Sequence, residues 1–382
     1  MLRTRTATLT ALVALALGAA PTWATGAAGA EQTAPAGYVV LLDNSPQATA
    51  RSAVETAGAH IRRTYDTVLD GYAVTATARQ ARQLAAQPGV RAVVPDTPVR
   101  ASAEQRDPTW NLDRIDQEKP PLDGVYRYPD SAGTGVTAYV LDTGVRIGHR
   151  EFGGRAAHGR DLVDGDDVAQ DGNGHGTHVA SVIAGARYGV AKKARVVAVR
   201  VLGDSGGGST STVIAGIEWV TEHAAKGPAV ANLSLGGAAN EALDEAVRNS
   251  IAAGVSYSTA AGSSNTDAGK FSPARVAEAL TTSATDQSDA RSGSANYGPA
   301  LDLFAPGRGI TAAWNGSDTA TATLSGTSMA AAHTTGAAAL RLGESPADTP
   351  ARLAAALTAA ASAGVVKQPG TGSPNLLLRV GR

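Results

Sequence analysis

Hydrophobic and polar positions follow different patterns in two regions of the chain. Residues 37–95 contain short alternating segments separated by amphipathic ones, which is typical of a small α+β unit. Strands are expected at 38–42, 71–75 and 90–94, and helices at 46–57 and 79–87. Residues 97–108 show no periodicity and contain two prolines, so this segment is predicted to be an exposed linker.

Beyond residue 108, short apolar segments alternate with longer amphipathic segments. Strands are expected at 136–141, 196–202, 230–235, 255–260 and 301–304, and helices at 211–226, 240–253, 329–342 and 351–363. This alternation predicts right-handed βαβ units. The fold class is therefore expected to be α/β, with a doubly wound, mainly parallel sheet covered by helices on both faces. Functional groups in such sheets gather where the strands end.

The composition removes several classes of function. Lys and Arg total 33 against 34 Asp and Glu, so the formal net charge of −1 gives no support for nucleic-acid binding. The chain has no cysteine, which excludes disulfides, thiolate metal sites and a cysteine nucleophile. The 44 glycines among 382 residues exceed the usual share of ~7 % and indicate many tight turns.

The first thirty residues have the pattern of a signal peptide. Arg3 and Arg5 precede an apolar stretch at 7–20, which is shorter than the ~20 residues of a membrane span. Small residues ending at Ala30 match a cleavage site, with Ala24 as an alternative. We therefore expect a secreted, extracellular protein without a membrane anchor.

Three candidate catalytic side chains lie at the ends of expected elements. Asp142 follows a strand, His175 begins an apolar helix, and Ser328 begins another helix, whose N-terminus favours developing negative charge. A serine hydroxyl is a weak nucleophile unless an imidazole takes its proton, and a carboxylate can orient that imidazole. Each residue alone is more often a turn, loop or capping residue. Together they indicate nucleophilic catalysis.

The motifs around these residues resemble those of secreted subtilisin-like serine proteases, most of all the proteinase K branch. The matching segments are 139–144, 171–178, 232–237 and 325–330. The resemblance implies Ser328 as nucleophile, His175 as general base and acid, and Asp142 as its orienting carboxylate, in the chain order of subtilisin. A zinc pair of His175 with His178 is a weaker alternative, because the glutamate of a His-Glu-x-x-His site is absent.

The resemblance also implies a substrate site. Two edge segments would pair with an extended peptide by β-augmentation, and small residues would leave the primary specificity pocket open. We expect large apolar or aromatic side chains at that subsite, and broad specificity otherwise. The implied substrate-binding residues are Gly206, Gly207, Ser234, Leu235, Gly236, Ala260, Ala261 and Gly262. A flexible loop is the alternative interpretation of the glycine run at 206–208.

The chain departs from the family at the oxyanion hole. Ser263 stands where relatives carry an asparagine whose amide donates to the oxyanion, so we expect an impaired hole in which the Ser328 backbone N–H remains as a donor. Ser256, Ser258 and Thr259 also place hydroxyls in a buried strand, where an unpaired hydroxyl costs ~1–3 kcal/mol. These features leave a second function open, a subtilisin-like fold that binds peptides but barely cleaves them.

Residues 31–102 resemble the inhibitory prosegment of this family. Its tail would occupy the cleft as a substrate and be cut near residues 101–103, leaving a catalytic domain at 103–382 that ends in a helical tail. The expected partners are protein and peptide substrates and the chain's own prosegment, which acts as an intramolecular inhibitor. We expect a monomer, with no nucleic-acid or membrane partner.

Calcium is the expected structural cofactor, and no organic cofactor is expected. Asp113, Asp116 and Gln117 are spaced i, i+3 and i+4, so one helical face would present oxygen ligands, together with Asp123. A solvated acidic face is the alternative interpretation. The resemblance implies a second site, at the Asp302 carboxylate and the carbonyl groups of Ala277 and Ala279.

Overall fold

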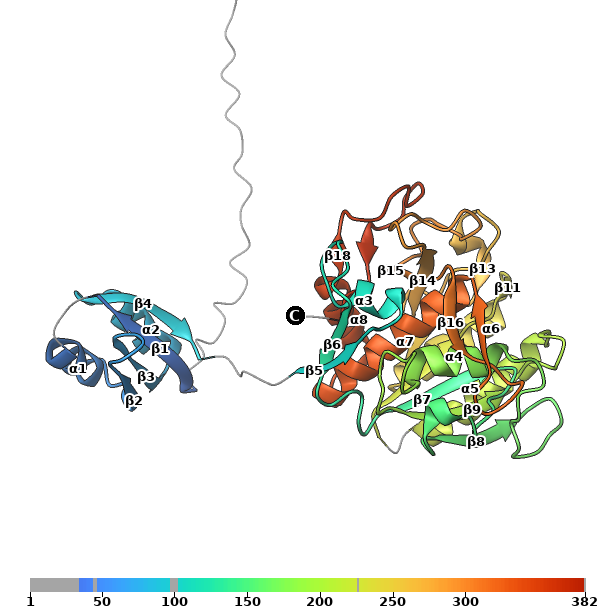
Figure 1. Cartoon of the computed structure of the whole chain (residues 1–382), viewed down its shortest axis with the longest axis horizontal. Coiled ribbons are helices and arrows are strands. Elements are labelled where there is room, and N and C mark those ends of the chain that lie inside the picture. The colour runs from blue at the N-terminus through green and yellow to red at the C-terminus, as the bar shows by residue number, and fades with distance from the viewer. Residues whose placement is uncertain (1–33, 44–46, 97–101, 225–226, 381–382) are drawn as a thin grey trace, which may run out of the picture. The chain divides into compact units, whose positions relative to one another are not determined.

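The computed structural model describes residues 34–43, 47–96, 102–224 and 227–380. They form two compact units, and the division falls between Val99 and Arg100 (Figure 1). The expected signal peptide at 1–30 and Ala101 of the expected cut lie outside the described residues.

The smaller unit is a four-stranded antiparallel sheet with two helices, in the strand order β2-β3-β1-β4. Its elements are β1 (Ala36–Leu42), α1 (Gln47–Thr56), β2 (His60–Tyr65), β3 (Gly71–Ala76), α2 (Ala78–Ala85) and β4 (Val90–Pro95). The expected strands and helices are confirmed. Strand β2 was not expected, because its sequence HIRRTY is mostly exposed and lacks an apolar repeat.

The larger unit is built on a nine-stranded sheet in the order β18-β19-β15-β14-β12-β10-β7-β9-β8. All its neighbouring strands are parallel except β18 and β19. The strands are β7 (Thr137–Asp142), β8 (Ala156–Asp161), β9 (Arg195–Arg200), β10 (Ala229–Leu233), β12 (Ser256–Ala260), β14 (Leu280–Thr285), β15 (Leu303–Pro306), β18 (Ser362–Ala363) and β19 (Leu376–Leu377). This confirms the expected α/β fold class.

Helices cover both faces of this sheet. The α-helices are α3 (Trp110–Ile115), α4 (His175–Ala184), α5 (Thr210–Ala224), α6 (Glu241–Ala252), α7 (Thr327–Glu344) and α8 (Pro350–Ala360). Ala138 and Val140 of β7 pack in the same core as α4 and α7, whereas Tyr139 and Leu141 pack in the core that holds α5 and α6. Both faces of β7 are therefore apolar, which explains the continuous hydrophobic run. Helix α7 runs through the middle of the unit (Figure 1).

Three short strand pairs and two 3₁₀ turns complete the larger unit. They are β5 (Ser102–Arg106) with β6 (Val125–Pro129), β11 (Gly237–Ala238) with β13 (Phe271–Ser272), β16 (Ile310–Ala313) with β17 (Thr321–Leu324), η1 (Arg150–Phe152) and η2 (Ala268–Lys270). The segment expected to be an exposed linker forms a strand at 102–106, because β5 pairs with a strand about twenty residues later. The expected helix at 351–363 ends at Ala360, and β18 and β19 then extend the sheet edge.

Most hydroxyls of the central strands β12 and β14 have hydrogen-bond partners, whereas the buried Thr285 hydroxyl at the end of β14 has none in the described part of the chain. Ser258 donates to the carbonyl oxygen of Ala331 at 3.1 Å, and the hydroxyls of Thr259 and Thr281 bond each other at 2.9 Å. Some buried polar side-chain atoms of the described residues have no hydrogen-bond partner, but the hydroxyls of Ser256, Ser258 and Thr259 are not among them. The expected cost of unpaired hydroxyls in this strand is therefore wrong. Within the described ranges, no helix has the length and apolar character that crossing a membrane requires.

Candidate active site

Asp142 and His175 meet where β7 ends and α4 begins. Asp142 is the last residue of β7 and is fully buried, and its Oδ1 lies 2.7 Å from Nδ1 of His175. The same oxygen accepts the Thr143 N–H at 2.8 Å. Burial opposes protonation of the imidazole, but the Asp142 carboxylate outweighs it and raises the pKa of His175 above its ordinary value. Asp142 therefore orients the ring and favours its charged form.

The buried carboxylate of Asp171, to which the sequence assigned no role, holds the start of α4. Asp171 accepts the backbone N–H groups of Asn173, Gly174 and Thr177 at 2.7–2.9 Å. The N–H groups of Gly174, the N-cap of α4, and of Thr177 are among those that a helix start leaves without intrahelical partners. Gly174 has φ +116°, and a Cβ there would lie 2.4 Å from the ring of Trp314. The glycines around His175 are therefore required by packing as well as by the turn.

Ser328 lies in the first turn of α7, beside the end of β10. Its hydroxyl donates to the carbonyl oxygen of Ser234 at 3.2 Å, and the Ser234 hydroxyl donates to the carbonyl oxygen of Ser328 at 2.8 Å. Asn232 donates to the Ser234 hydroxyl, and Thr335 donates to the Asn232 side chain. Sequence reasoning noted the segment that contains Asn232 but not this network, because Thr335 is 103 residues away in the chain.

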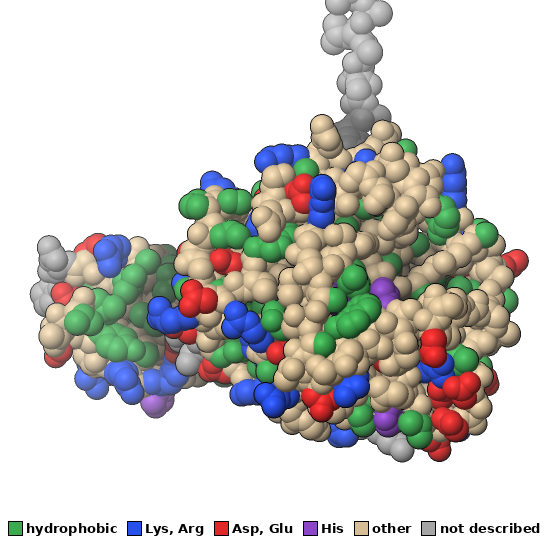
Figure 2. Space-filling model, turned by 45° about the vertical axis from the view of Figure 1, so that its right-hand side comes forward, with side chains coloured by type: hydrophobic (Ala, Val, Ile, Leu, Met, Phe, Trp, Pro, Cys, Tyr) green, Lys and Arg blue, Asp and Glu red, His purple; other side chains and the backbone are tan. Residues whose placement is uncertain are grey.

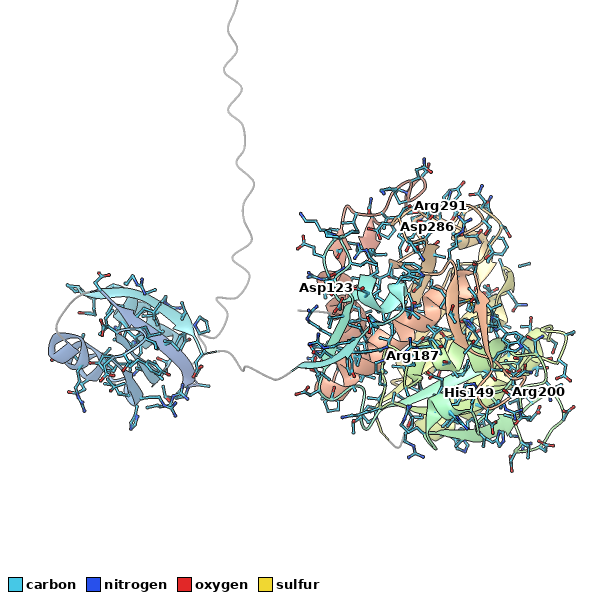
Figure 3. All side chains as sticks on the ribbon, viewed as in Figure 1. Asp123, His149, Arg187, Arg200, Asp286 and Arg291 are labelled. Atoms are coloured by element: carbon cyan, nitrogen blue, oxygen red, sulfur yellow. The ribbon has the colours of Figure 1, made fainter. Side chains whose placement is uncertain are left out.

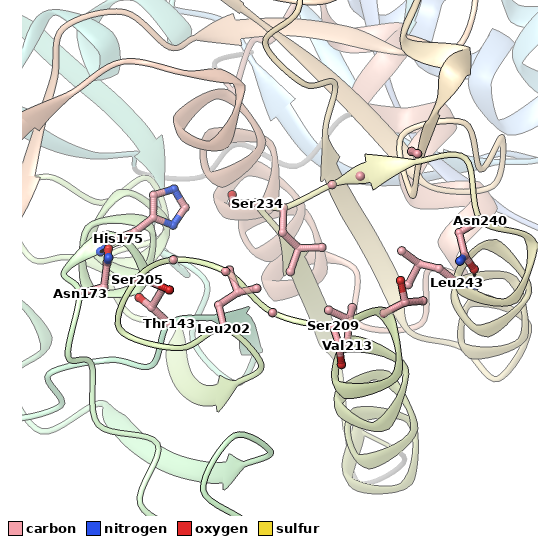
Figure 4. A pocket seen from close by; sticks show the side chains of 18 of the residues that line it. Thr143, Asn173, His175, Leu202, Ser205, Ser209, Val213, Ser234, Asn240 and Leu243 are labelled. Carbon is pink, nitrogen blue, oxygen red and sulfur yellow. Dashed lines mark hydrogen bonds between the residues drawn. The ribbon is translucent and has the colours of Figure 1, made fainter.

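Two neighbouring cavities lie beside these residues and share residues 234–238. The larger, of about 720 Å³, is lined by His175, Leu202 and Val213 and by the glycine run 206–208. Figure 4 shows His175 at one end of this cavity and Asn240 and Leu243 at the other. On the face drawn in Figure 2, the surface around one histidine is mainly uncharged and hydrophobic. None of the residues that line the larger cavity is Asp, Glu, Lys or Arg, so the cavity is suited to an extended, uncharged peptide segment.

The smaller cavity, of about 280 Å³, adjoins Ser328. It is lined by residues 234–238 and 260–264 and by Phe271 and Ala274. The structure thus brings all the expected substrate residues, Gly206, Gly207, Ser234, Leu235, Gly236, Ala260, Ala261 and Gly262, to the two cavities. Ser263 also lines the smaller cavity and is exposed.

The first group of expected calcium ligands is mostly used in hydrogen bonds. Asp113 accepts the N–H groups of Asp123 and Gly124, and Asp123, labelled in Figure 3, pairs with Arg127 at 2.7 Å. Asp116 has a fully buried side chain whose Oδ1 finds no hydrogen-bond partner among the described residues. Burial raises the pKa of Asp116 to about 6. An unpaired buried carboxylate oxygen is a suitable ligand for a hard cation.

Nε2 of Gln117 donates to the carbonyl oxygen of Pro121 at 3.3 Å, and its Oε1 is the atom that could bind a cation. At the second expected site, Asp302 accepts the N–H of Thr281 at 2.8 Å, and burial raises its pKa to about 6. Ala277 and Ala279 lie just before β14, which begins beside Asp302. Within the described ranges, no three His, Cys, Asp or Glu side chains form a metal cluster, so carbonyl oxygens would have to supply further ligands.

A strand-end carboxylate paired with a histidine, a serine at a helix N-terminus and a peptide-sized groove on a parallel α/β sheet define a serine protease. Residues 133–381 match the family described as "Subtilase family", and residues 32–102 match "Peptidase inhibitor I9". The chain belongs to the subtilase family of serine proteases and carries an I9 inhibitor prosegment. The family expected from the motifs is therefore confirmed.

Several relatives are similar over most of the chain. An "Extracellular serine proteinase" of Thermus sp. (strain Rt41A) is 51 % identical over 332 residues, which are 87 % of this chain and 80 % of the relative. An "Alkaline serine exoprotease A" of Vibrio alginolyticus is 47 % identical, over 83 % of this chain and 60 % of the relative. The crystal structure of a cold-adapted subtilisin-like serine proteinase matches with a TM-score of 0.70 and 50 % identity, covering 72 % of this chain and 98 % of that chain.

Proposed function

We propose that this chain is a secreted serine endopeptidase whose catalytic triad is Asp142, His175 and Ser328. The observation that carries the proposal is the 2.7 Å contact between the buried Asp142 and His175, at one end of a groove whose adjoining pocket reaches Ser328. With Nδ1–H directed at Asp142, Nε2 of the imidazole is free to accept a proton. The extracellular relatives, and the signal pattern at 1–30, support secretion.

The reaction follows from these positions. The Ser328 hydroxyl turns from Ser234 toward His175 and attacks the peptide carbonyl carbon while its proton passes to Nε2. The carbonyl oxygen takes up the displaced electron pair as an oxyanion. Collapse of this intermediate breaks the C–N bond, and the leaving amine takes the proton from His175. Water then releases the acyl group by the same two steps.

The oxyanion would have fewer donors than in typical relatives. The Ser328 N–H is one donor, and Ser263 offers a short hydroxyl instead of an amide. Loss of one such donor costs about 10²–10³ in kcat in subtilisin. We therefore expect a complete triad with reduced turnover. The same serine supports a second candidate function, a peptide-binding protein with little turnover.

The substrate would lie extended between residues 206–208 and 234–236, with its P1 side chain in the pocket of about 280 Å³. Ala260 and Ala261 contribute only methyl groups to that pocket and Gly262 has no side chain, which favours large apolar or aromatic P1 residues. The prosegment would inhibit the site until it is cut near residues 101–103. Calcium would be held by Asp302 with the carbonyl groups of Ala277 and Ala279, and by Asp116.

Hydrolysis of a peptide with an aromatic P1 residue tests the two functions. We expect hydrolysis that a serine-directed inactivator and Ser328→Ala both abolish, and a kcat that Ser263→Asn raises roughly tenfold or more. Stoichiometric labelling of Ser328 without turnover would support the binding protein instead. Equal cleavage after acidic residues would contradict the P1 preference. Formation of the short mature form by Ser328→Ala in a protease-free host would contradict self-processing.

A further inference from the structure

Asn296 uses both polar atoms of its side-chain amide to hold residues that line the active-site pocket. It lies in the connection between β14 and β15 and is fully buried. Its Oδ1 accepts the N–H groups of Ser264 at 2.9 Å and Thr266 at 3.2 Å. Its Nδ2 donates to the carbonyl oxygen of Ala261 at 2.8 Å. These three partners belong to residues 261–266, which we call the oxyanion loop.

The backbone of the oxyanion loop is also shaped around this amide. The Asn296 N–H donates to the carbonyl oxygen of Gly262 at 2.9 Å. Gly262 has φ +93°, and a Cβ there would lie 2.6 Å from Nδ2 of Asn296. Only glycine combines this backbone conformation with so close an approach at low cost. The loop therefore follows the asparagine on both sides of Ser263.

Other contacts also hold the loop, among them backbone hydrogen bonds that join Ala261 to Thr282, Asn265 to Ser294 and Thr266 to Tyr297. The Gly262 N–H donates to the hydroxyl of Thr327, the residue before Ser328, at 3.1 Å. The side chain of Asn265 accepts from Arg291, labelled in Figure 3, at 3.0 Å. Arg291 reaches the far end of the loop, whereas Asn296 bonds the residues on either side of Ser263.

We propose that Asn296 is a positioning residue that sets the oxyanion loop against Ser328, and so determines how well this loop stabilises the transition state. The proposal rests on the proposed protease function. An oxyanion donor acts only within about 2.7–3.1 Å of the developing charge. A shift of ~1 Å can cost ~10²-fold in rate. Asn296 is absent from the lining of both cavities, so its effect passes through Ser263 and its neighbours.

An amide is the side chain that this position requires. It supplies an acceptor toward Ser264 and Thr266 and a donor toward Ala261 from one planar group. A carboxylate would set oxygen against the Ala261 carbonyl group and bury a charge, and a serine could satisfy at most part of the set. The control is Ser283→Ala. The buried Ser283 hydroxyl donates to the backbone carbonyl oxygen of Asn296 at 2.6 Å but bonds no residue of the oxyanion loop.

The kinetic test compares Asn296→Ser with Ser283→Ala in the mature enzyme, using the aromatic-P1 peptide. We expect Asn296→Ser to lower kcat roughly tenfold or more, with a smaller change in KM, and Ser283→Ala to leave kcat within about threefold. We also expect the gain from Ser263→Asn to shrink to less than about threefold in the Asn296→Ser background. An unchanged kcat, or the same gain in both backgrounds, would overturn the proposal.

A second measurement does not depend on turnover. In the full chain with Ser328→Ala, amide hydrogen exchange at Ser264 and Thr266 should be roughly tenfold faster or more in Asn296→Ser, because each amide loses its acceptor. The Ser283→Ala control should leave exchange at both amides unchanged. Equal exchange in the two variants would refute the anchoring role. Absence of Ser328-dependent hydrolysis in the unmodified enzyme would instead refute the proposed function.

Discussion

Replacing Asp289 by asparagine should destabilise the larger unit by leaving a buried cation without its counter-charge. Arg114 in α3 and Asp289 after β14 have side chains 2 % and 6 % exposed. The guanidinium donates to both carboxylate oxygens at 2.7 and 3.0 Å, and to the carbonyl oxygen of Gln117 at 2.9 Å. Asparagine keeps the shape and tolerates the left-handed backbone at this position, where φ is +62°. The variant therefore changes mainly the charge.

The magnitude follows from burial. Breaking a buried ion pair by removing one partner costs about 3–5 kcal/mol, because the remaining charge stays desolvated. At about 2 °C per kcal/mol, suited to a unit of this size, Tm should fall by roughly 6–10 °C. Removing both charges with Arg114→Met and Asp289→Asn should recover part of the loss, since replacing a buried pair by apolar groups is often nearly neutral.

Thermal unfolding of the full chain with Ser328→Ala measures this without self-digestion, at fixed pH and calcium. The control is Glu104→Ala, which breaks an ion pair with Arg106 whose side chains are 45 % and 77 % exposed. We expect a loss below about 1 kcal/mol there. A change in Asp289→Asn no larger than in this control, or a double variant less stable than Asp289→Asn alone, would refute the reasoning.

Three further predictions concern the site and its cation. Asp142→Asn should lower kcat by roughly 10³–10⁴ and move the acidic limb of kcat/KM to lower pH, because the carboxylate raises the pKa of His175; an unmoved limb in a pH–rate profile would contradict this. We expect calcium to raise Tm, and this rise should shrink as pH falls from 8 to 5, because burial raises the pKa of Asp302 to about 6 and the carboxylate would bind the cation only when ionised. In chelator the pH dependence has the opposite sign. Because the folded-state pKa of Asp302 lies above the ordinary 3.8, this group stabilises the fold below about pH 4, and the stabilisation is lost as pH rises through 6. With Asp302→Asn as the control, a Tm that does not change with pH, either with or without calcium, would contradict both statements. Gly262→Ala should lower kcat more than tenfold in steady-state assays. The control is Gly254→Ala, which should leave kcat unchanged because Gly254 has a similar φ of +105° but open space around it. Equal effects of the two variants would show that backbone strain alone is responsible.

The parallel sheet could be predicted because its strands are apolar on both faces. Strand β7 shows this, since it packs against helices on each side. Strand β14, with the sequence LTTSAT, is equally buried but was not predicted. Its hydroxyls hide the apolar pattern, and their partners, such as Thr334 for Thr282 and Asn296 for Ser283, lie elsewhere in the chain. Sequence patterns do not show such pairing before the fold is known.

The residues of the site also divide into those that the sequence predicts and those that only the folded structure shows. Asp142, His175 and Ser328 could be proposed because each lies in a short motif next to an element end. Asp171 and Asn296 could not be assigned roles, since each acts through backbone N–H groups that only the folded loops bring together. A local signal existed for Asp171, an acidic residue shortly before a helix. Nothing in the local sequence around Asn296 indicates the oxyanion loop.

The absence of cysteine acquires a structural meaning at the start of the larger unit. Helix α3 follows the expected prosegment cut by only a few residues, yet it is attached to three distant parts of the chain. Arg114 pairs with Asp289, the Ile115 carbonyl oxygen accepts the Val380 N–H, and Asn111 bonds Nε2 of His333. His333 lies in α7, the helix that carries Ser328, and burial lowers its pKa to about 4. At neutral pH His333 therefore stays neutral and accepts a hydrogen bond from Asn111. Processing would make the segment that contains α3 the new N-terminus, and polar contacts rather than disulfides attach this segment to the helix of the nucleophile.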